Sequence, residues 1–479
     1  MNKLKAFIEK YKSSDLIFKA TIWFVLVTVI DNGISVITQP FVNRILSVEQ
    51  VGAFNVFSTW STLLRIVTTF NLYCGVYEVF LVDHKEDQEQ LRGSLCVLST
   101  LFMFVTFGLI FLFIHPIAAQ LQLKPVYLVA MFFLILSEAI IQFYIVPLRF
   151  NYNYVRYSVF VVALFFCKSL LTILLSYLLS ADRVLGRILG LTLPSFLVAM
   201  VLLVVILKKT SRRSLTKYWN QSIKFNLPLI PHYLSSVVLA SSDKVMIQRL
   251  AGDFYVGLYS VAFTYSNLSN IVFTAINNSY TPWALNAIKE KDYPSLKKRT
   301  NAIILISVLF CIALMLFAPE GISILGGGEY LQALHAVPML IAGTFLSTFY
   351  FIFSNVEFVN KKTKLVFPIT ITGAGINILL NWLLIPRIGY AAAAYTTFVG
   401  YLIIGTCHYL YSRKIAQENV FDLKFILAML LLLVAGAMGS LLIYQLHFLI
   451  RYLLALLLCV STLALFIRFR KKKSAPEAA

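Results

Sequence analysis

The sequence predicts an all-α polytopic membrane protein with about fourteen transmembrane helices. Of its 479 residues, 59% are hydrophobic and only 13% are charged, so a soluble domain of this size would lack the polar surface that must face water. The mean hydropathy is +0.81. Apolar runs of roughly 20 residues recur along the whole chain, and a run of that length crosses the hydrocarbon core of a bilayer as one helix.

The predicted spans follow one another with short polar loops between them. They begin near residues 17, 52, 94, 126, 155, 185, 224, 254, 301, 331, 364, 390, 422 and 449. Of the 41 Lys and Arg residues, 31 lie on the side of the two termini and 8 on the opposite side, with Arg65 and Lys168 inside spans. Because positive loops remain in the cytoplasm, both termini are predicted to be cytoplasmic. The net charge of +20 thus reflects topology, and no nucleic-acid partner is expected.

The chain contains an internal repeat. Residues 43–60 align without a gap with residues 248–265, at a constant offset of 205 residues. The matching pairs are Arg44 with Arg249, Val51 with Val256, Gly52 with Gly257, Phe54 with Tyr259, Val56 with Val261, Thr59 with Thr264 and Trp60 with Tyr265. The same offset pairs Glu138 with Gly343 and Lys168 with Gly373. A repeat of this kind is typical of transporters.

The repeat predicts two lobes of six helices. Each lobe enters and leaves on the same side, so a pseudo-twofold axis along the membrane normal should relate them, with a cleft between. The predicted divisions are a first lobe (1–207), a basic cytoplasmic linker acting as a hinge (208–223), a second lobe (224–412), and helices 13 and 14 with a basic tail (413–479). Residues 4–11, with apolar side chains on one face, suit a helix on the membrane surface.

Polar side chains form a stripe on the second span of each lobe. Spacings of three and four residues place them on one helix face. Because polar groups are costly against lipid, both stripes are predicted to face the protein interior or a water-filled cleft, although hydrogen bonding between helices is the alternative. The stripe residues assigned to a head-group cavity are Thr62, Thr69, Asn267, Asn270, Thr274 and Asn278.

Four charges lie deep inside spans of the first lobe: Asp31, Arg65, Glu138 and Lys168. Each is roughly 18–21 Å into its span, too deep to reach water easily. Either these groups form internal ion pairs, or Arg65 and Lys168 attract an anionic head group while Asp31 or Glu138 exchanges a proton or sodium ion. An Arg guanidinium offers a fork of donors that suits phosphate oxygens.

A second cluster of polar residues is predicted near the outer end of span 7. Asp243 and Lys244, with the turn arginines Arg44 and Arg249, are expected to form an outward-facing ring, Asp243 being a third candidate for ion coupling. In the same span, Pro228 and Pro231 free backbone carbonyls and predict a bend. These turn and proline residues are the candidates for gating.

Signals of catalysis are missing from the sequence. The run Gly326-Gly327-Gly328 lies in an outer loop and lacks the context of a phosphate-binding loop. We found no nucleophile–base pair in the loops and no His/Cys spacing typical of a metal site. The sequence therefore predicts a transporter without a cofactor, not an enzyme, whose transport is passive or coupled to an H⁺ or Na⁺ gradient.

Two stretches resemble a known family. The span 7–8 block NLPLIPHYLSSVVLASSDKVMIQRLAGDFYVGLYSVAF is similar to polysaccharide-biosynthesis flippases, in which a proline-containing helix precedes Asp-(Lys/Arg), a small Gly turn and Val-Gly-x-Tyr. The stretch NILLNWLLIPRIGYAAAAYTT resembles that family's Asn-rich helix and its Ala-rich sequel. The likeness extends over nearly the whole chain in length, span number and repeat.

The resemblance implies an O-antigen (Wzx-type) flippase of the multidrug/oligosaccharidyl-lipid/polysaccharide exporter superfamily. Such proteins move undecaprenyl-diphosphate-linked oligosaccharides to the outer leaflet of the bacterial inner membrane by alternating access. Membrane lipids, a polysaccharide polymerase and chain-length proteins are the partners it implies. The family's basic lumen would correspond to Arg65 and Lys168.

Three rival functions remain open. A cation-coupled multidrug antiporter on the same scaffold would favour acidic cavity residues, whereas two basic residues balance two acidic ones here. A membrane glycosyltransferase or polysaccharide polymerase would need longer outer loops with catalytic residues. A peptidoglycan-precursor flippase would differ only in its substrate.

Overall fold

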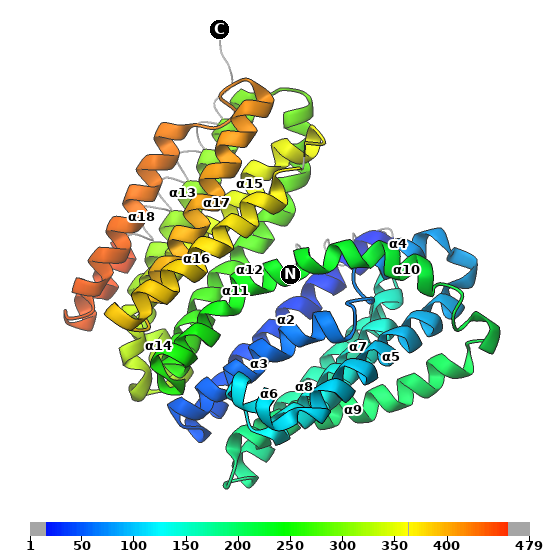
Figure 1. Cartoon of the computed structure of the whole chain (residues 1–479). Coiled ribbons are helices and arrows are strands. Elements are labelled where there is room, and N and C mark those ends of the chain that lie inside the picture. Colours follow the sequence, from blue (N-terminus) through cyan, green and yellow to red (C-terminus); the bar gives the residue numbers. More distant parts are fainter. Residues whose placement is uncertain (1–15, 363, 458–479) are drawn as a thin grey trace, which may run out of the picture. The chain divides into compact units, whose positions relative to one another are not determined.

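The computed structural model describes residues 16–362 and 364–457, and all of their regular secondary structure is helical (Figure 1). The predicted all-α class is therefore confirmed. The predicted surface helix at residues 4–11 and the basic tail lie outside the described residues. Of the fourteenth span, residues 448–457 are described and helical.

Thirteen described helices of 21 residues or more fall one each on predicted spans one to thirteen. They are α2 (Leu16–Ile45), α3 (Val48–Thr68), α5 (Gln88–Leu112), α7 (Pro125–Phe150), α8 (Tyr154–Leu178), α9 (Arg183–Lys208), α11 (Ile230–Ala251), α12 (Asp253–Lys289), α13 (Tyr293–Leu316), α15 (Val337–Val359), α16 (Val366–Ile388), α17 (Ala392–Ala416) and α18 (Leu423–Ile443).

Nine of these thirteen are apolar enough to cross a membrane by length and composition. The other four, α3, α11, α12 and α17, are long enough but more polar. A transmembrane helix with polar side chains has to turn them away from lipid. These four helices therefore indicate where the polar interior of the protein lies.

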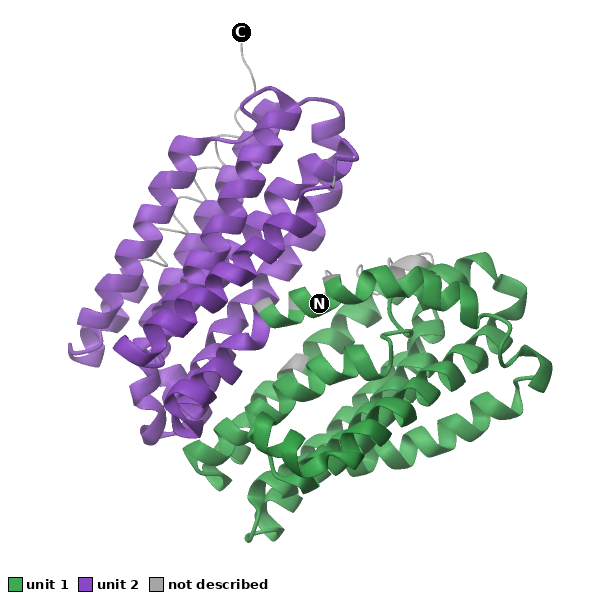
Figure 2. Cartoon of the chain, in the orientation of Figure 1, with its two compact units in different colours: residues 1–238 green, residues 239–479 purple. Residues whose placement is uncertain are grey.

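The chain folds into two compact units, residues 1–238 and 239–479, and the division falls within α11 (Figure 2). In unit 1, α9 packs along α7 and α8, and in unit 2 its counterpart α17 packs along α15 and α16. These three helices thus make the same contacts in both units, as the sequence repeat predicts.

Helix boundaries reproduce the repeat through the first half of each unit. Ser47 precedes α3 and caps it with its side chain, and Gly252 precedes α12, 205 residues later. The starts of α5 and α13 differ by the same 205 residues. The short helices α6 (Ile114–Leu121) and α14 (Ala318–Gly326) lie at corresponding positions after them.

The offset then changes, which corrects two sequence alignments. The 3-10 helix η4 (Gly328–His335) precedes α15, and α15 begins 212 residues after α7, as α16 does after α8. The pairing of Glu138 with Gly343 and of Lys168 with Gly373 was therefore wrong. The alignment failed because an extra turn in one copy of a repeat shifts everything after it.

Small residues bring α8 and α9 into close contact. A Cβ atom at Gly190 would lie 2.4 Å from the Thr172 Cα, and one at Gly186 would lie 2.3 Å from the Leu175 carbonyl oxygen. These separations exclude any side chain unless the helices move apart. The i, i+4 glycine pair is the packing motif that apolar helices use when lipid replaces water.

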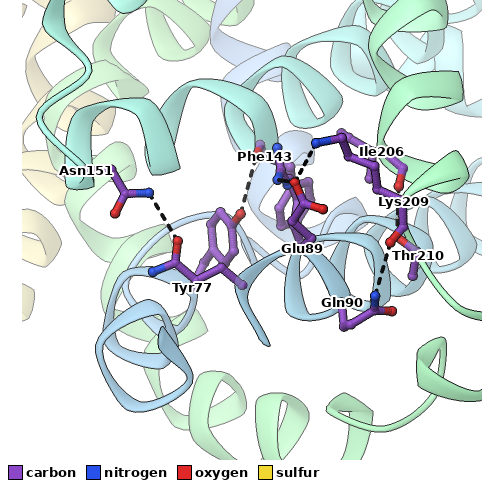
Figure 3. A network of polar contacts seen from close by, with 10 residues as sticks. Tyr77, Glu89, Gln90, Phe143, Asn151, Ile206, Lys209 and Thr210 are labelled. Atoms are coloured by element: carbon purple, nitrogen blue, oxygen red, sulfur yellow. Dashed lines mark hydrogen bonds and ion pairs between the residues drawn. The ribbon is translucent and has the colours of Figure 1, made fainter. Parts of the chain in front are cut away.

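The segment predicted as a linker is structured and belongs to unit 1. It forms η2 (Arg212–Ser214) and α10 (Trp219–Asn226), and it packs on the start of α5. Lys209 Nζ lies 2.6 Å from Glu89, and Gln90 donates to the Lys209 carbonyl at 3.1 Å (Figure 3). A little further on, Lys217 and Tyr218 both donate to Asp87, the lysine at 2.6 Å. The predicted hinge is thus tied down along much of its length.

Shorter elements complete the two units. Those not yet named are α4 (Val76–Asp83), η1 (Lys85–Asp87) and η3 (Leu227–Leu229). The last of these separates α10 from α11 and contains Pro228, while Pro231 occupies the first turn of α11. The helix type therefore changes at the two prolines, with a 3-10 turn between two α-helices.

Candidate functional site

Unit 1 contains an ion pair between two spans. Arg65 Nη1 on α3 lies 2.9 Å from Glu138 Oε2 on α7, and the two side chains are 33% and 30% exposed. Arg65 Nε is buried and has no hydrogen-bond partner among the described residues. The guanidinium therefore keeps unused donor capacity although one of its faces is occupied by Glu138.

Lys168 on α8 joins this pair into a cluster. Its ammonium interacts electrostatically with Glu138, Asp31 and Arg65, and lies 5.7 Å from the ring of Phe165. Within the described part of the chain it forms no ion pair shorter than 4 Å. The structure thus brings together all four charges singled out in the sequence, but only one of the two internal ion pairs considered there has formed.

The hydroxyl groups of the α3 stripe are largely used by the helix itself. Thr62 donates to the Ser58 carbonyl at 2.9 Å, and Thr69 donates to the carbonyl of Arg65 at 2.5 Å. Thr69 is fully buried, where its oxygen also accepts from the Asn71 backbone. Thr62 is half-buried on the same face as Arg65. Arg65, not the threonines, therefore dominates the polar chemistry of this helix.

Unit 2 contains a cavity of about 260 Å³ among α12, α13 and α15. None of the described residues that line it is charged. Its polar wall consists of amide and hydroxyl side chains: Asn270, Thr274, Asn277, Asn278, Ser307 and Thr348. The fourth predicted residue of this stripe, Asn267, accepts a hydrogen bond from Asn270 at 3.0 Å. The predicted polar face of α12 therefore opens on a cavity.

Apolar and aromatic side chains complete the lining of the cavity. They include Phe273, Tyr280, Phe345 and Phe351 together with isoleucine side chains. Tyr280 directs its hydroxyl away to Thr300, at 2.7 Å, so its ring is left as an apolar surface. A neutral site lined by both amides and aromatic rings suits a hydroxylated or amphipathic ligand better than an ion.

A buried carboxylate forms a second polar centre in unit 2. Asp243 is 4% exposed and accepts three hydrogen bonds, from Tyr259 at 2.6 Å, Thr397 at 2.7 Å and Asn381 at 2.7 Å. Asn377 lies beside it and donates to Thr397. The prediction of an outward-facing ring was thus wrong for Asp243, because α11 turns this face toward α12, α16 and α17.

The remaining members of the predicted ring lie elsewhere. Arg44 is exposed at the end of α2, and Arg249 is exposed at the end of α11. Lys244 is half-buried, with its ammonium 5.2 Å from the ring of Phe263. The two turn arginines therefore lie exposed in the last turns of their helices.

Sequence reasoning missed the partners of Asp243. Asn377 and Asn381 are one helical turn apart on α16, and Thr396 and Thr397 follow in α17. The signal that could have identified them is the i, i+4 pair of asparagines in an otherwise apolar span. Amide side chains in such a span are stable only when they meet another polar group.

Comparison with known proteins identifies the class. A family model described as polysaccharide biosynthesis protein matches residues 17–287, more than half of the chain, and the MatE model matches residues 228–383. The chain is similar to Lsg locus putative protein 1 of Haemophilus influenzae, with 22% identity over 73% of this chain and 86% of that protein. It also shows 25% identity to an uncharacterized membrane protein of Methanocaldococcus jannaschii, over 49% of each chain.

Solved structures support the same fold. The lipid II flippase MurJ in an inward closed conformation has a TM-score of 0.61 at 16% identity, over 94% of this chain and 99% of that one. An inward-facing multidrug resistance MATE transporter has a TM-score of 0.60 at 14% identity, over 81% of this chain and 94% of that one. The protein is thus a multi-pass membrane transporter of the multidrug/oligosaccharidyl-lipid/polysaccharide superfamily. Within it, the chain belongs to the polysaccharide biosynthesis family.

Proposed function

We propose that this protein is a flippase that moves undecaprenyl-diphosphate-linked oligosaccharides from the cytoplasmic to the outer leaflet of the bacterial inner membrane, with both termini in the cytoplasm. The observation that carries the proposal is the clustering in unit 1 of two cations, Arg65 and Lys168, which the sequence predicts to lie deep inside their spans. Cations are costly at that depth, so a site that retains them is expected to serve an anionic group. A diphosphate is such a group, and Arg65 has the planar fork that binds its oxygens.

The uncharged cavity of unit 2 supports the second half of the proposal. A lipid-linked oligosaccharide carries neutral hydroxyl-rich rings beyond its phosphates. Amides and threonine hydroxyls, such as those of Asn270, Asn278 and Thr274, hydrogen-bond sugar hydroxyls, while Tyr280 and Phe351 offer apolar surface. We therefore assign the charged part of the head group to unit 1, and propose the cavity of unit 2 as a separate site for hydroxylated groups such as sugars.

Transport in this proposal follows alternating access and draws on an ion gradient. The candidates for the coupling group are Asp31 and Glu138 in unit 1 and Asp243 in unit 2, with H⁺ or Na⁺ as the ion. The 3-10 turn that holds Pro228, next to Pro231, is a place where α10 and α11 could change their angle. A polymerase and chain-length proteins would receive the product outside.

A cation-coupled multidrug antiporter is the second candidate, and the MatE match over residues 228–383 favours it. Its site would need a net negative cavity for an organic cation. In unit 1 the four clustered charges sum to zero, and Arg65 keeps donors free for an anion. The flippase is therefore the better fit to the described side chains.

The test is transfer of a fluorescent undecaprenyl-diphosphate oligosaccharide across proteoliposome membranes, with and without an imposed H⁺ or Na⁺ gradient. Protein-dependent transfer is expected, and its response to each gradient identifies the coupling ion. Uptake of organic cations with no transfer from a panel of lipid-linked sugars would instead assign the antiporter.

A further inference from the structure

Unit 2 holds a second buried acid, which no part of the proposed site uses. Glu357 on α15 and His408 on α17 form a pair, with Nδ1 of the imidazole 2.6 Å from Oε1 of the carboxyl group. Both side chains are completely buried, at 0% exposure. Each also has one buried atom without a hydrogen-bond partner among the described residues, Glu357 Oε2 and His408 Nε2. The pair thus satisfies only two of its four polar atoms.

The protonation states of such a pair follow from its geometry. A contact of 2.6 Å between a ring nitrogen and a carboxyl oxygen requires one proton between them. With that proton alone, the pair is a neutral imidazole beside a carboxylate and carries a charge of −1. One further proton gives a net charge of zero, as imidazolium beside carboxylate if it binds Nε2 or as imidazole beside carboxylic acid if it binds Oε2. The vacant positions for the second proton are therefore the unpartnered Nε2 and Oε2.

Burial decides which of the two states is favoured. An isolated carboxylate in a dry interior carries a large desolvation cost, which an adjacent cation reduces. Among the described residues, no Lys or Arg nitrogen lies within 4 Å of the Glu357 carboxyl group, and Arg413 and Lys414 lie in the last turn of α17. The buried pair therefore favours the doubly protonated, neutral state.

Helices packed around the pair keep their charges at their ends. On α13 these are Lys297, Lys298 and Arg299, on α18 Lys424, on α16 Arg387, and on α12 Asp253 and Lys289. The titratable group that faces the pair is Tyr350, whose ring lies 5.1 Å from that of His408. Lys361 and Lys362 follow directly after α15. Water and the pair thus meet only if α15 and α17 separate near this end.

We propose that Glu357 and His408 form a proton-binding site of unit 2, loaded when the pair is buried and unloaded when it opens to water. Each opening of the buried, loaded pair releases one proton, and each closure takes one up again. Glu357 lies two residues before the end of α15, the end predicted to face the cytoplasm, so this exchange would take place with cytoplasmic water. Because uptake and release share that side, the pair moves no proton across the membrane; resting on the flippase proposal, it makes the opening of α15 and α17 depend on cytoplasmic pH.

A purely structural tie between α15 and α17 would have a different signature. Structural polar pairs are retained when all their atoms are satisfied, since a half-satisfied buried pair is less stable than an apolar contact. Here Nε2 and Oε2 remain unsatisfied. A group that binds and releases a proton has to keep such an atom available.

The first experiment needs no transport substrate. Infrared difference spectra of purified protein in lipid, recorded between pH 5 and 9, should contain imidazole and carboxylate bands that are lost in both Glu357→Gln and His408→Gln. Glu418→Gln and His447→Gln change exposed residues and serve as matched controls that keep the bands. Wild-type spectra without a pH-dependent band assignable to Glu357 or His408 would overturn the proposal.

The second experiment separates the pH dependence of opening from transport itself. In proteoliposomes with the fluorescent undecaprenyl-diphosphate oligosaccharide, a pH gradient with the higher pH on the side of the protein's cytoplasmic face should accelerate the wild type about tenfold, within the usual range of coupling free energies. Both variants should lose this acceleration yet keep gradient-free exchange within about twofold of wild type. Retained acceleration overturns the proposal. Pair-specific infrared bands without any transfer would leave the proton site in place and overturn the flippase assignment.

A third variant keeps the proposal testable if a single variant fails to fold. If a single variant fails to insert, the double variant Glu357→Gln/His408→Gln removes both charges and leaves two amides that can hydrogen-bond each other. It is expected to insert and to show neither the bands nor the acceleration. Acceleration by a pH gradient in this double variant would overturn the proposal on its own.

Discussion

The interiors of the two units differ in chemistry although their helices follow the same repeat. Unit 1 gathers two cations and two anions from four helices, and the pair Arg65–Glu138 remains about one-third exposed. Unit 2 gathers amides and hydroxyls around a neutral cavity, and buries two acids in its interior, Asp243 among neutral donors and Glu357 against His408. One copy of the scaffold thus keeps charge near solvent, and the other hides it.

This difference teaches that the repeat preserves packing but leaves interior chemistry free to change. Contacts among the last three helices of each repeat recur in both units, as α9 on α7 and α8 in unit 1 and as α17 on α15 and α16 in unit 2. Those contacts depend on shape and small residues, which both copies can keep while polar positions diverge. Four variants should distinguish the shared helix packing from the interior chemistry that differs between the units, from the largest expected effect to the smallest.

Arg65→Gln should reduce transport of the fluorescent lipid-linked oligosaccharide by roughly a hundredfold, since losing one member of a buried charged contact costs about 3 kcal/mol. Membrane insertion should be unchanged. Arg156→Gln, at an exposed position at the start of α8, is the control. Adding Glu138→Gln distinguishes the roles of Arg65: transport restored in the double variant would mean that Arg65 only neutralises Glu138. Wild-type rates in Arg65→Gln and Lys168→Gln would refute phosphate recognition in unit 1.

Asp243→Ala should destabilise unit 2 by about 3 kcal/mol, because Tyr259, Thr397 and Asn381 would each lose their acceptor in a buried site. Thermal unfolding in detergent measures the effect, with Glu329→Ala at an exposed position as the control. Asp243→Asn retains a similar shape and an acceptor oxygen, so it should unfold close to wild type. An Asp243→Ala variant as stable as wild type would contradict the network.

Gly190→Ala should destabilise unit 1 by about 2 kcal/mol, since its Cβ would lie 2.4 Å from the Thr172 backbone and α9 would have to move away from α8. Gly108→Ala is the matched control, because a Cβ there meets nothing within 4 Å. The readout is the same thermal unfolding assay. Equal stability of both variants would show that the α8–α9 contact is looser than described.

Lys217→Ala should have the smallest effect, a severalfold faster tryptic cleavage after Arg212 and Arg213. Hydrogen bonds from Lys217 and Tyr218 lower the pKa of Asp87 below its ordinary value of 3.8. The stabilisation from Asp87 is therefore complete at pH values above the ordinary pKa of 3.8, and it is lost as the pH falls through the lowered pKa of the folded protein. Wild-type cleavage, corrected for protease activity, should therefore not change between pH 6 and 8. Faster cleavage at pH 6 would contradict the assignment, and Lys291→Ala is the control.

Sequence alone predicted the helical class, thirteen helices in order and the repeat of the first half of each unit. These features depend on the length of each apolar run and on the residues at each turn, and both are set by residues that are close together in the sequence. It also singled out Asp31, Arg65, Glu138 and Lys168, because a charge deep inside an apolar run is conspicuous. Their mutual contact was not predictable, since Arg65 and Glu138 are 73 residues apart.

Tertiary structure decided which way polar groups face. Asp243 follows the same helical pattern whether it points outward or inward, and only the packing of α12, α16 and α17 places it inside. Glu357 and His408 escaped notice because each lies toward the end of its span, where charges are ordinary, and only the contact of α15 with α17 buries them. Hydropathy fixes how deep a residue lies in the membrane, whereas the angle of each helix about its own axis depends on neighbours that are distant in the chain.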